Sequence, residues 1–255
     1  MLKTVKRVGR AALVPSLVIL AAGASHSAPT APPDHGIALV ELFTSEGCSS
    51  CPRADALLER LAADAATSGR PVYCLSFHVD YWDHLGWKDR FSSAAFTERQ
   101  GEYAKRLGAT SLYTPQMVVN GSKEFMGSDR NAAESAIRDA LSRSEEASLK
   151  LEATAKGHDI SARCQVAHVP AGAVLNVAWV DAHASSKPSR GENDGRTLRH
   201  VNVVRDLRST APRSGAISEL SLHRPELSDG AVIAWVQASG SGRVLAAQSV
   251  RITAR

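Results

Sequence analysis

Two cysteines separated by two residues are the most chemically informative feature of this 255-residue sequence. Cys48 and Cys51 follow an apolar run, IALVELF, and stand where the helical pattern ADALLERLAAD begins. This spacing at a helix start lets the two sulfurs approach to bonding distance, and the free N–H groups and positive dipole end of the helix stabilise a thiolate. We therefore expect a redox-active dithiol, with Cys48 as the exposed nucleophile and Cys51 as the thiol that resolves a mixed disulfide.

The same pair has other uses, namely half of a zinc site or a structural disulfide. Zinc normally takes a second pair of ligands, and the remaining cysteines, Cys74 and Cys164, lack that spacing. Copper is the competing use, because Cys48, Cys51 and His78 form a soft set of ligands. Cys74 lies in a strand pattern and is expected to be an inert packed thiol. A bridge between Cys74 and Cys164 is an alternative that needs a geometry the sequence does not supply.

A second group of polar residues follows the apolar strand pattern VYCLSFHVD. His78, Asp80 and Trp82 stand at its carboxyl end, the edge at which open α/β sheets place their sites. We expect them to line a substrate groove beside the dithiol, with Trp82 as an apolar platform. For His78, a structural role at the end of the strand is the alternative.

A third candidate is the polar segment RGENDGR at residues 190–196. It is either a solvated surface loop or a segment whose Glu192, Asn193 and Arg196 close over the dithiol. In the second case, the Arg196 guanidinium either faces Cys48, where an opposite charge lowers a thiol pKa, or pairs with Glu192.

The elements that must position these residues change along the chain. Residues 37–145 alternate strand and helix patterns in the order βαβαββα, with Asn120-Gly121 as a hairpin turn. Residues 146–255 hold seven short strand-like runs separated by Gly-, Pro- and Ser-rich turns, which is typical of an antiparallel sandwich. The predicted fold is an α/β thioredoxin-like N-terminal domain followed by an all-β, sandwich-like C-terminal domain.

The predicted first domain resembles the thioredoxin superfamily in its strand IALVELF, its motif CSSC, its Thr114-Pro115 pair and its hairpin QMVVNGSKEF. More narrowly, four blocks look like the secreted bacterial family catalogued as domain of unknown function 1223, over about residues 37 to 255. These blocks are LFTSEGCSSCP, FHVDYWDHLGWKDRF, YTPQMVVNG and GENDGRTLRHVNVVR.

The superfamily resemblance implies roles for particular residues. It makes Cys48 the attacking thiol, Cys51 the resolving thiol and Pro115 a cis-proline that faces them. Thr114 would then pair its backbone with an extended substrate. A buried acid on the first strand is matched by Glu41, whose carboxyl would have a raised pKa and take the proton from Cys51. The alternative for Glu41 is a partly solvated strand-end residue.

One residue departs from the superfamily pattern. Gly47 stands directly before Cys48, where an aromatic residue is common. This departure weakens the expectation that an ordinary thioredoxin reductase reduces the protein.

The N-terminal segment has the three parts of a secretory signal peptide. Basic residues end at Arg10, an apolar run spans Ala11 to Ala22, and small residues precede a cleavage site near Ala24. We expect a signal peptide over residues 1–24 and a Pro-rich flexible leader over 25–36. A membrane anchor is the alternative, but the run is shorter than the ~20 residues that span a bilayer.

Composition limits the classes of function. With 44% hydrophobic and 22% charged residues, the chain is an ordinary globular protein rather than a disordered or multi-span membrane chain. The formal net charge of +4 comes from the N-terminal segment, since four basic and no acidic residues stand among the first 24. The predicted mature chain is therefore neutral and gives no indication of nucleic-acid binding.

Together these features predict an exported, periplasmic or extracellular, thiol-disulfide exchange protein. Its substrates would be protein or small thiols and disulfides, and neither a cofactor nor a stable membrane anchor after cleavage is expected. The sequence does not set the direction of exchange, because the two residues between the cysteines are neutral. The alternative is a copper-handling or peptide-binding module whose dithiol does not turn over.

Overall fold

The computed structural model describes residues 1, 2, 4 and 36–254, of which 36–254 lie within one compact unit. Most of the predicted signal peptide and leader lies outside the described residues. No helix in the described part of the chain is long and apolar enough to cross a membrane.

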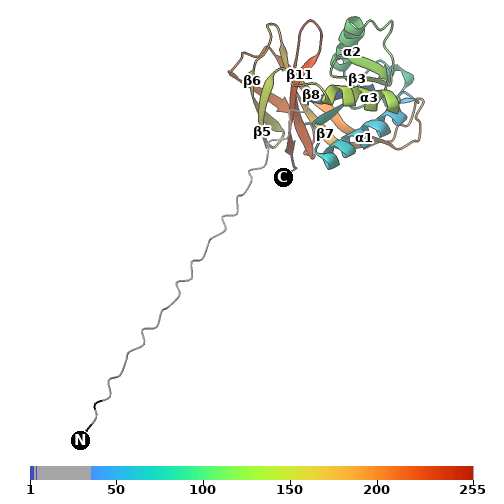
Figure 1. The fold of residues 1–255 in the computed structure, drawn as a ribbon. Helices are drawn as coiled ribbons and strands as arrows, with labels where there is room; N and C mark the ends of the chain where they lie inside the picture. Colours follow the sequence, from blue (N-terminus) through green and yellow to red (C-terminus); the bar gives the residue numbers. More distant parts are fainter. Residues whose placement is uncertain (3, 5–35, 255) are drawn as a thin grey trace. The chain divides into compact units, whose positions relative to one another are not determined.

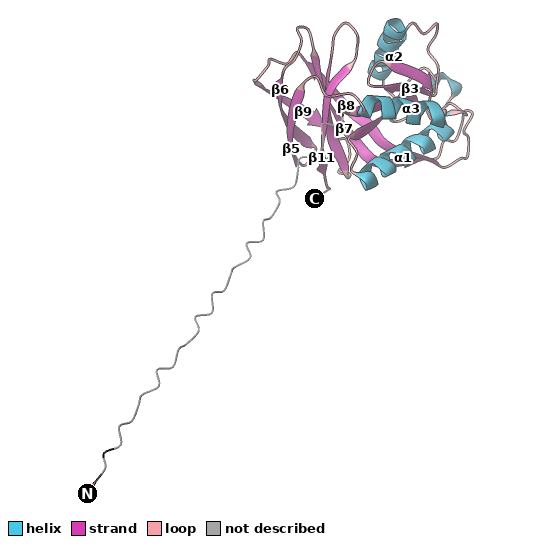
Figure 2. Ribbon diagram, in the orientation of Figure 1, coloured by secondary structure: helices cyan, strands magenta, loops and turns pink. Residues whose placement is uncertain are grey.

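Eleven strands, three α-helices and one short 3-10 helix make up this unit (Figures 1 and 2). Their bounds are β1 (Ala38–Thr44), α1 (Cys51–Ser68), β2 (Val72–His78), η1 (Asp83–Leu85), α2 (Ala94–Leu107), β3 (Gln116–Val119), β4 (Lys123–Met126), α3 (Arg130–Leu141), β5 (Ser148–Lys156), β6 (Asp159–Ala167), β7 (Val174–Ser186), β8 (Leu198–Thr210), β9 (Ile217–His223), β10 (Gly230–Gln237) and β11 (Val244–Ile252).

Strands from both halves of the chain join in one mixed, eight-stranded sheet. Its order is β11-β10-β7-β8-β2-β1-β3-β4, and a separate three-stranded sheet has the order β5-β6-β9. The two halves meet where β2 pairs with β8 in parallel, at Ser76 and Val203. The pairs β1–β2 and β2–β8 are parallel and the other pairs of the large sheet are antiparallel.

The predicted fold class is therefore wrong. The first half is not a self-contained thioredoxin-like α/β domain, and the second half is not a separate sandwich. Four strands of the second half, β7, β8, β10 and β11, extend the sheet that β1 to β4 begin. The boundary predicted at residues 145/146 falls inside the compact unit, between α3 and β5. Alternating apolar runs identify strands, but they do not specify which strand pairs with which.

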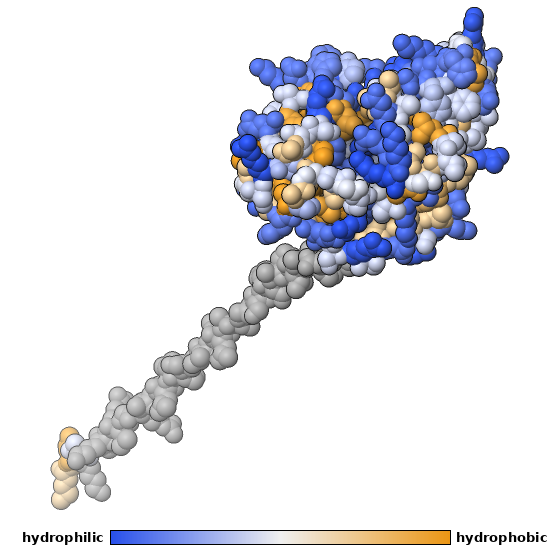
Figure 3. Space-filling view, turned by 90° about the horizontal axis from the view of Figure 1, so that it is seen from above, coloured by the Kyte–Doolittle hydropathy of each residue, from blue (hydrophilic) through white to orange (hydrophobic). Residues whose placement is uncertain are grey.

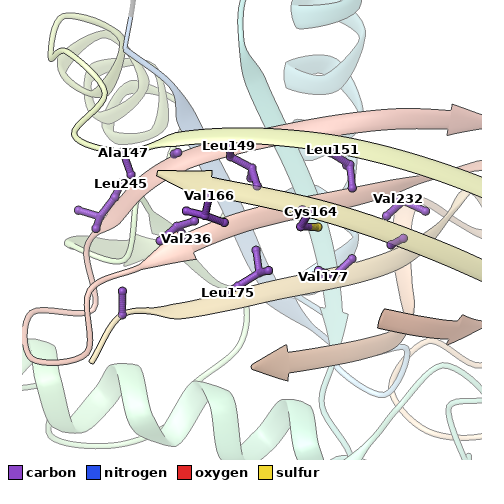
Figure 4. Close-up of a cluster of buried hydrophobic side chains, with 14 of the residues drawn as sticks. Ala147, Leu149, Leu151, Cys164, Val166, Leu175, Val177, Val232, Val236 and Leu245 are labelled. Carbon is purple, nitrogen blue, oxygen red and sulfur yellow. The ribbon is translucent and has the colours of Figure 1, made fainter. Parts of the chain in front are cut away.

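Three apolar clusters hold the layers together. Helices α1 and α3 pack on one face of the large sheet, where α1 buries Leu57, Leu58 and Leu61 at helical spacing. Helix α2 contributes Phe96 and Tyr103 to a cluster with the opposite side chains of β1, β2, β7 and β10. The small sheet covers β7, β10 and β11 through the third cluster (Figure 4). Figure 3 shows one face of the molecule, on which hydrophobic side chains form small patches among hydrophilic ones.

The register of the first strands places the candidate residues at one edge of the sheet. Thr44, at the end of β1, pairs with His78 at the end of the parallel strand β2. On the other side of β1, Phe43 pairs with Gln116, the first residue of the antiparallel strand β3. The loop after β1 and the residues before β3 are therefore neighbours.

Candidate functional site

The CSSC motif lies in the loop after β1 and begins helix α1. Cys48 and Cys51 form a disulfide with a Cα–Cα distance of 5.4 Å. The backbone N–H of Cys51 donates to the carbonyl of Cys48 at 3.2 Å, which closes a turn at the start of the helix. The predicted pairing of these two cysteines is confirmed.

The residues before β3 lie against this disulfide. The Thr114–Pro115 peptide bond is cis, as predicted. The Cys48 sulfur is 3.8 Å from the carbonyl oxygen of Thr114, and the Trp82 indole N–H donates to the Thr114 hydroxyl at 2.8 Å. A Cβ at Gly47 would lie 2.9 Å from the Cβ of Trp82, so the absence of a side chain at Gly47 lets Trp82 pack against the motif.

The segment at residues 190–196 covers the motif from the β7–β8 connection. The side-chain amide of Asn193 is fully buried and donates to the carbonyls of both Glu46 and Cys48 at 2.9 Å. The Glu192 carboxylate accepts from the backbone N–H of Ser49 at 2.9 Å. These contacts join the motif to a segment more than 140 residues away in the sequence.

Arg196 supports this cover indirectly. Its guanidinium donates to the Asn193 side-chain oxygen at 2.7 Å and so fixes the orientation of that amide. The predicted pairing of Arg196 with Glu192 is not among the observed contacts. Whether these residues bind substrate stays a prediction.

Cys48 is not exposed in the disulfide form. Only 1% of its surface is accessible, whereas the intervening Ser49 and Ser50 are exposed. The expectation of an exposed nucleophile rested on the helix start alone, which says nothing of the distant segment that packs over it. Cys48 is contacted both by this segment, through its carbonyl, and by the Thr114 carbonyl, through its sulfur.

Glu41 is buried but is engaged elsewhere. Its carboxylate accepts from Arg99 Nε at 2.6 Å and from the Tyr103 hydroxyl at 2.5 Å. Its strand neighbours Val40 and Leu42 face α1, whereas Glu41 points to the face that α2 covers. This placement disagrees with the predicted transfer of a proton from Cys51, because side chains alternate between the two faces of a strand.

His78 and Asp80 do not line an open groove beside the disulfide. His78 is fully buried, and its Nδ1 is 2.7 Å from the Asp89 carboxylate. Asp80 accepts from the hydroxyl of Thr97 in α2 at 2.6 Å. Of the three residues predicted at this strand end, the structure brings Trp82 to the Thr114 side of the motif.

Sequence reasoning missed three buried ionisable residues that lie around the motif, namely Glu46, Asp55 and His200. His200 Nε2 lies 3.6 Å from a Glu46 oxygen, and His200 Nδ1 lies 3.6 Å from an Asp55 oxygen. One signal was available, since Asp55 interrupts the buried face of α1 four residues after Cys51. Glu46 lies in a loop and His200 in a strand, and neither pattern has the helical periodicity that would mark a polar residue on a buried face.

The other two cysteines are free and buried. Burial raises the pKa of the Cys74 thiol to about 12 and that of Cys164 to about 11. Among the described residues, no group of three or more His, Cys, Asp or Glu side chains is arranged to hold a metal ion. The copper alternative gains no support from the two bonded cysteines and the Asp89-bound His78.

A family model described as protein of unknown function DUF1223 matches residues 39–237, which include the motif, the cis-proline and the segment over them. The chain belongs to this family. No curated protein matches it. The comparisons do not show membership in the thioredoxin superfamily.

Two solved structures are similar over most of the chain. A crystal structure of a protein from Agrobacterium tumefaciens is 26% identical, with a TM-score of 0.62, over 86% of this chain and 96% of that one. HBP35 of Porphyromonas gingivalis is 16% identical, with a TM-score of 0.59, over 86% of this chain and 76% of that one. The second likeness shows the fold alone.

Proposed function

We propose that the protein carries out thiol-disulfide exchange through Cys48 and Cys51. A substrate thiolate attacks the Cys48 sulfur, the Cys48–Cys51 bond breaks, and Cys51 leaves as a thiolate. A second substrate thiolate then attacks the substrate sulfur of the mixed disulfide and releases Cys48. Two electrons pass from the substrate dithiol to the protein, and the reverse sequence reduces a substrate disulfide.

The observation that carries this proposal is the position of the disulfide. It stands at the first turn of a helix, where the N–H groups favour a developing thiolate, and its Cys48 sulfur faces the Thr114 carbonyl. The substrates we propose are protein or small thiols and disulfides, with no nucleic acid.

Equilibration with mixtures of reduced and oxidised glutathione tests the proposal. The fraction of protein with the Cys48–Cys51 bond, measured by alkylation and mass spectrometry, should follow the glutathione ratio reversibly. Cys74→Ser is the matched control, because this free thiol is buried and should leave the equilibrium unchanged. A disulfide that no glutathione ratio opens in the folded protein would refute exchange and leave a structural bond.

Trapping experiments assign the two thiols. Cys51→Ser should accumulate a mixed disulfide when its Cys48 thiolate attacks a substrate disulfide and expels one substrate thiolate, because the resolving thiol is missing. Cys48→Ser should accumulate none. Equal trapping by both variants would contradict the assigned order of attack.

We also propose export, which rests on the basic, apolar and small-residue parts of residues 1–24. Expression of the full chain in a bacterial host, followed by fractionation and N-terminal sequencing, tests it. The expected product is soluble periplasmic protein that begins near Ser25. An intact N-terminus on membrane-bound protein would contradict it.

A further inference from the structure

Five buried ionisable side chains form a cluster that flanks the disulfide. They come from the loop after β1, from α1, β2 and β8, and from the loop before α2, and each is at most 6% exposed. They are Glu46, Asp55, His78, Asp89 and His200. We call this set the histidine–acid cluster.

The cluster is close to both cysteines along the chain. Glu46 stands two residues before Cys48, and the side-chain amide of Asn193 donates to the backbone carbonyls of both residues. Asp55 stands four residues after Cys51 on the buried face of α1, a spacing that puts two side chains about 6 Å apart between their Cβ atoms. Asp55 is therefore the carboxylate nearest to Cys51 on its own helix.

His200 lies between these two acids. Its two ring nitrogens lie 3.6 Å from the Glu46 and Asp55 oxygens, and its ring meets that of His78 edge to face at 4.7 Å. Burial alone would lower the pKa of His200, but Asp55 and Glu46 outweigh it and raise this pKa to about 10. His200 is thus an imidazolium at neutral pH, and it compensates charges that are costly to bury alone.

Other charged groups around His200 are already paired. On β2 and in the loop before α2, His78 Nδ1 faces Asp89, whose pKa is lowered by His78 against the effect of burial. The second Glu46 oxygen accepts from the Trp87 indole at 2.6 Å. On β8, Arg205 pairs with Asp181 and stacks on Phe91, whose ring lies 5.9 Å from that of His200.

Several polar side-chain atoms of the cluster are buried without a direct hydrogen bond. Among the described residues, five atoms of this cluster are buried and have no hydrogen-bond partner. They are one oxygen of Glu46, one oxygen of Asp55, Nε2 of His78 and both ring nitrogens of His200. Polar atoms in such surroundings are normally satisfied, and those that are not often mark a working site. The Asp55 side chain has one oxygen toward His200 and a second that is free to serve another group.

We propose that His200, through Asp55, supplies the proton that Cys51 takes up when the disulfide opens. This inference rests on the proposed function. Attack on Cys48 expels Cys51 as a thiolate, which Glu46 and Asp55 destabilise because like charges repel. The His200 imidazolium gives its proton to the Asp55 carboxylate, and Asp55 passes that proton to the Cys51 sulfur, so the net change is one thiol gained and one imidazolium neutralised. Disulfide formation returns the proton by the same route.

The test is the pH dependence of disulfide reduction by dithiothreitol, measured between pH 6 and 11. His200→Gln and Asp55→Asn are compared with the wild type, and His183→Gln on β7 is the control, because that histidine is exposed. Ratios of wild-type to variant rates are used, since they cancel the ionisation of dithiothreitol itself. Positioned proton transfer contributes roughly 10²- to 10⁴-fold, so we expect both variants to be at least about tenfold slower at pH 7.

The way in which the ratio of wild-type to variant rates changes with pH distinguishes proton supply from a structural role. Above about pH 10 His200 is neutral in the wild type, so the ratio should fall toward one, whereas a packing defect would persist. Far-UV circular dichroism checks that each variant is folded. If His200→Gln fails to fold, the test is the comparison of Asp55→Asn with the pH dependence of the wild-type reduction rate. A ratio that stays constant with pH in a folded variant would overturn the proposal. Failure of the wild type to exchange at all would instead refute the proposed function.

Discussion

Asn193 is the residue whose removal should change access to the disulfide most. Its amide makes two buried hydrogen bonds, to the carbonyls of Glu46 and Cys48, and it is the main polar link between the motif and the β7–β8 connection. Asn193→Ala removes both donors without altering either cysteine. The expected result is faster reduction of the disulfide, because Cys48 is only 1% exposed under this segment.

The size of the effect follows from the two bonds. A buried hydrogen bond contributes about 1 kcal/mol net, so the pair contributes about 2 kcal/mol to keeping the segment closed. Since each 1.4 kcal/mol is a factor of ten, the open population should rise roughly 30-fold. If reduction requires the open form, its rate rises by the same factor.

Reduction by excess dithiothreitol, followed by quenching and mass spectrometry, measures this rate. Arg196→Ala removes only the 2.7 Å bond that orients Asn193 and should give a smaller acceleration. Asn131→Ala, an exposed asparagine in α3, is the control. An Asn193→Ala rate within twofold of the wild type, with folding retained, would mean that the segment does not limit access and that the reasoning is wrong.

Three further changes have defined outcomes. Glu192→Gln should speed alkylation of reduced Cys48 at pH 7 by roughly two- to fivefold, because it removes a like charge near the thiolate while an amide oxygen can still accept from Ser49. Gly47→Ala should lower the free energy of unfolding by about 1 to 3 kcal/mol, because the new Cβ would lie 2.9 Å from the Cβ of Trp82. The stability that His200 contributes is complete below its unfolded pKa of 6.5 and should be lost as pH rises through its folded pKa of about 10, measured by urea unfolding at several pH values.

Each of these has a control and a contrary result. Glu152→Gln, an exposed acid on β5, should leave alkylation unchanged, and equal rates in both glutamine variants would contradict a local charge effect. Gly101→Ala in α2 meets no atom within 4 Å and should not destabilise the protein. For the predicted loss of stability at high pH, the contrary result is a His200→Gln variant whose free energy of unfolding changes with pH as steeply as that of the wild type; it would exclude His200 as the titrating group.

What the sequence predicted well depends on local spacing. The pairing of Cys48 with Cys51 and the helix that follows them were expected from neighbouring residues, and the cis bond before Pro115 was expected from the resemblance to the thioredoxin superfamily; the structure contains all three. Helix periodicity and helix-start chemistry are properties of a few consecutive residues, so they are visible without the fold.

What the sequence did not reveal depends on contacts between distant residues. The pairing of β2 with β8 joins Ser76 to Val203, and the residue pattern of neither strand identifies the other as its partner. The same limit applies to Cys48, whose carbonyl accepts from Asn193, and to Glu41, whose partner Arg99 lies in another element. A strand pattern fixes which side chains share a face, but it does not decide what packs on that face.

Because the second half of the chain completes both the sheet and the site, the first half should not work alone. A fragment of residues 36–145 would lack Asn193 and His200 and would leave the β2 edge without β8. It would also expose Leu75 and Phe77, which pack against residues of β7 and β10 such as Trp235. An unpaired edge beside an uncovered apolar face promotes association between chains. We expect this fragment to aggregate during size-exclusion chromatography, whereas residues 36–255 elute as a defined species. A monomeric, cooperatively folding fragment would show that the sheet is not shared in the way described here.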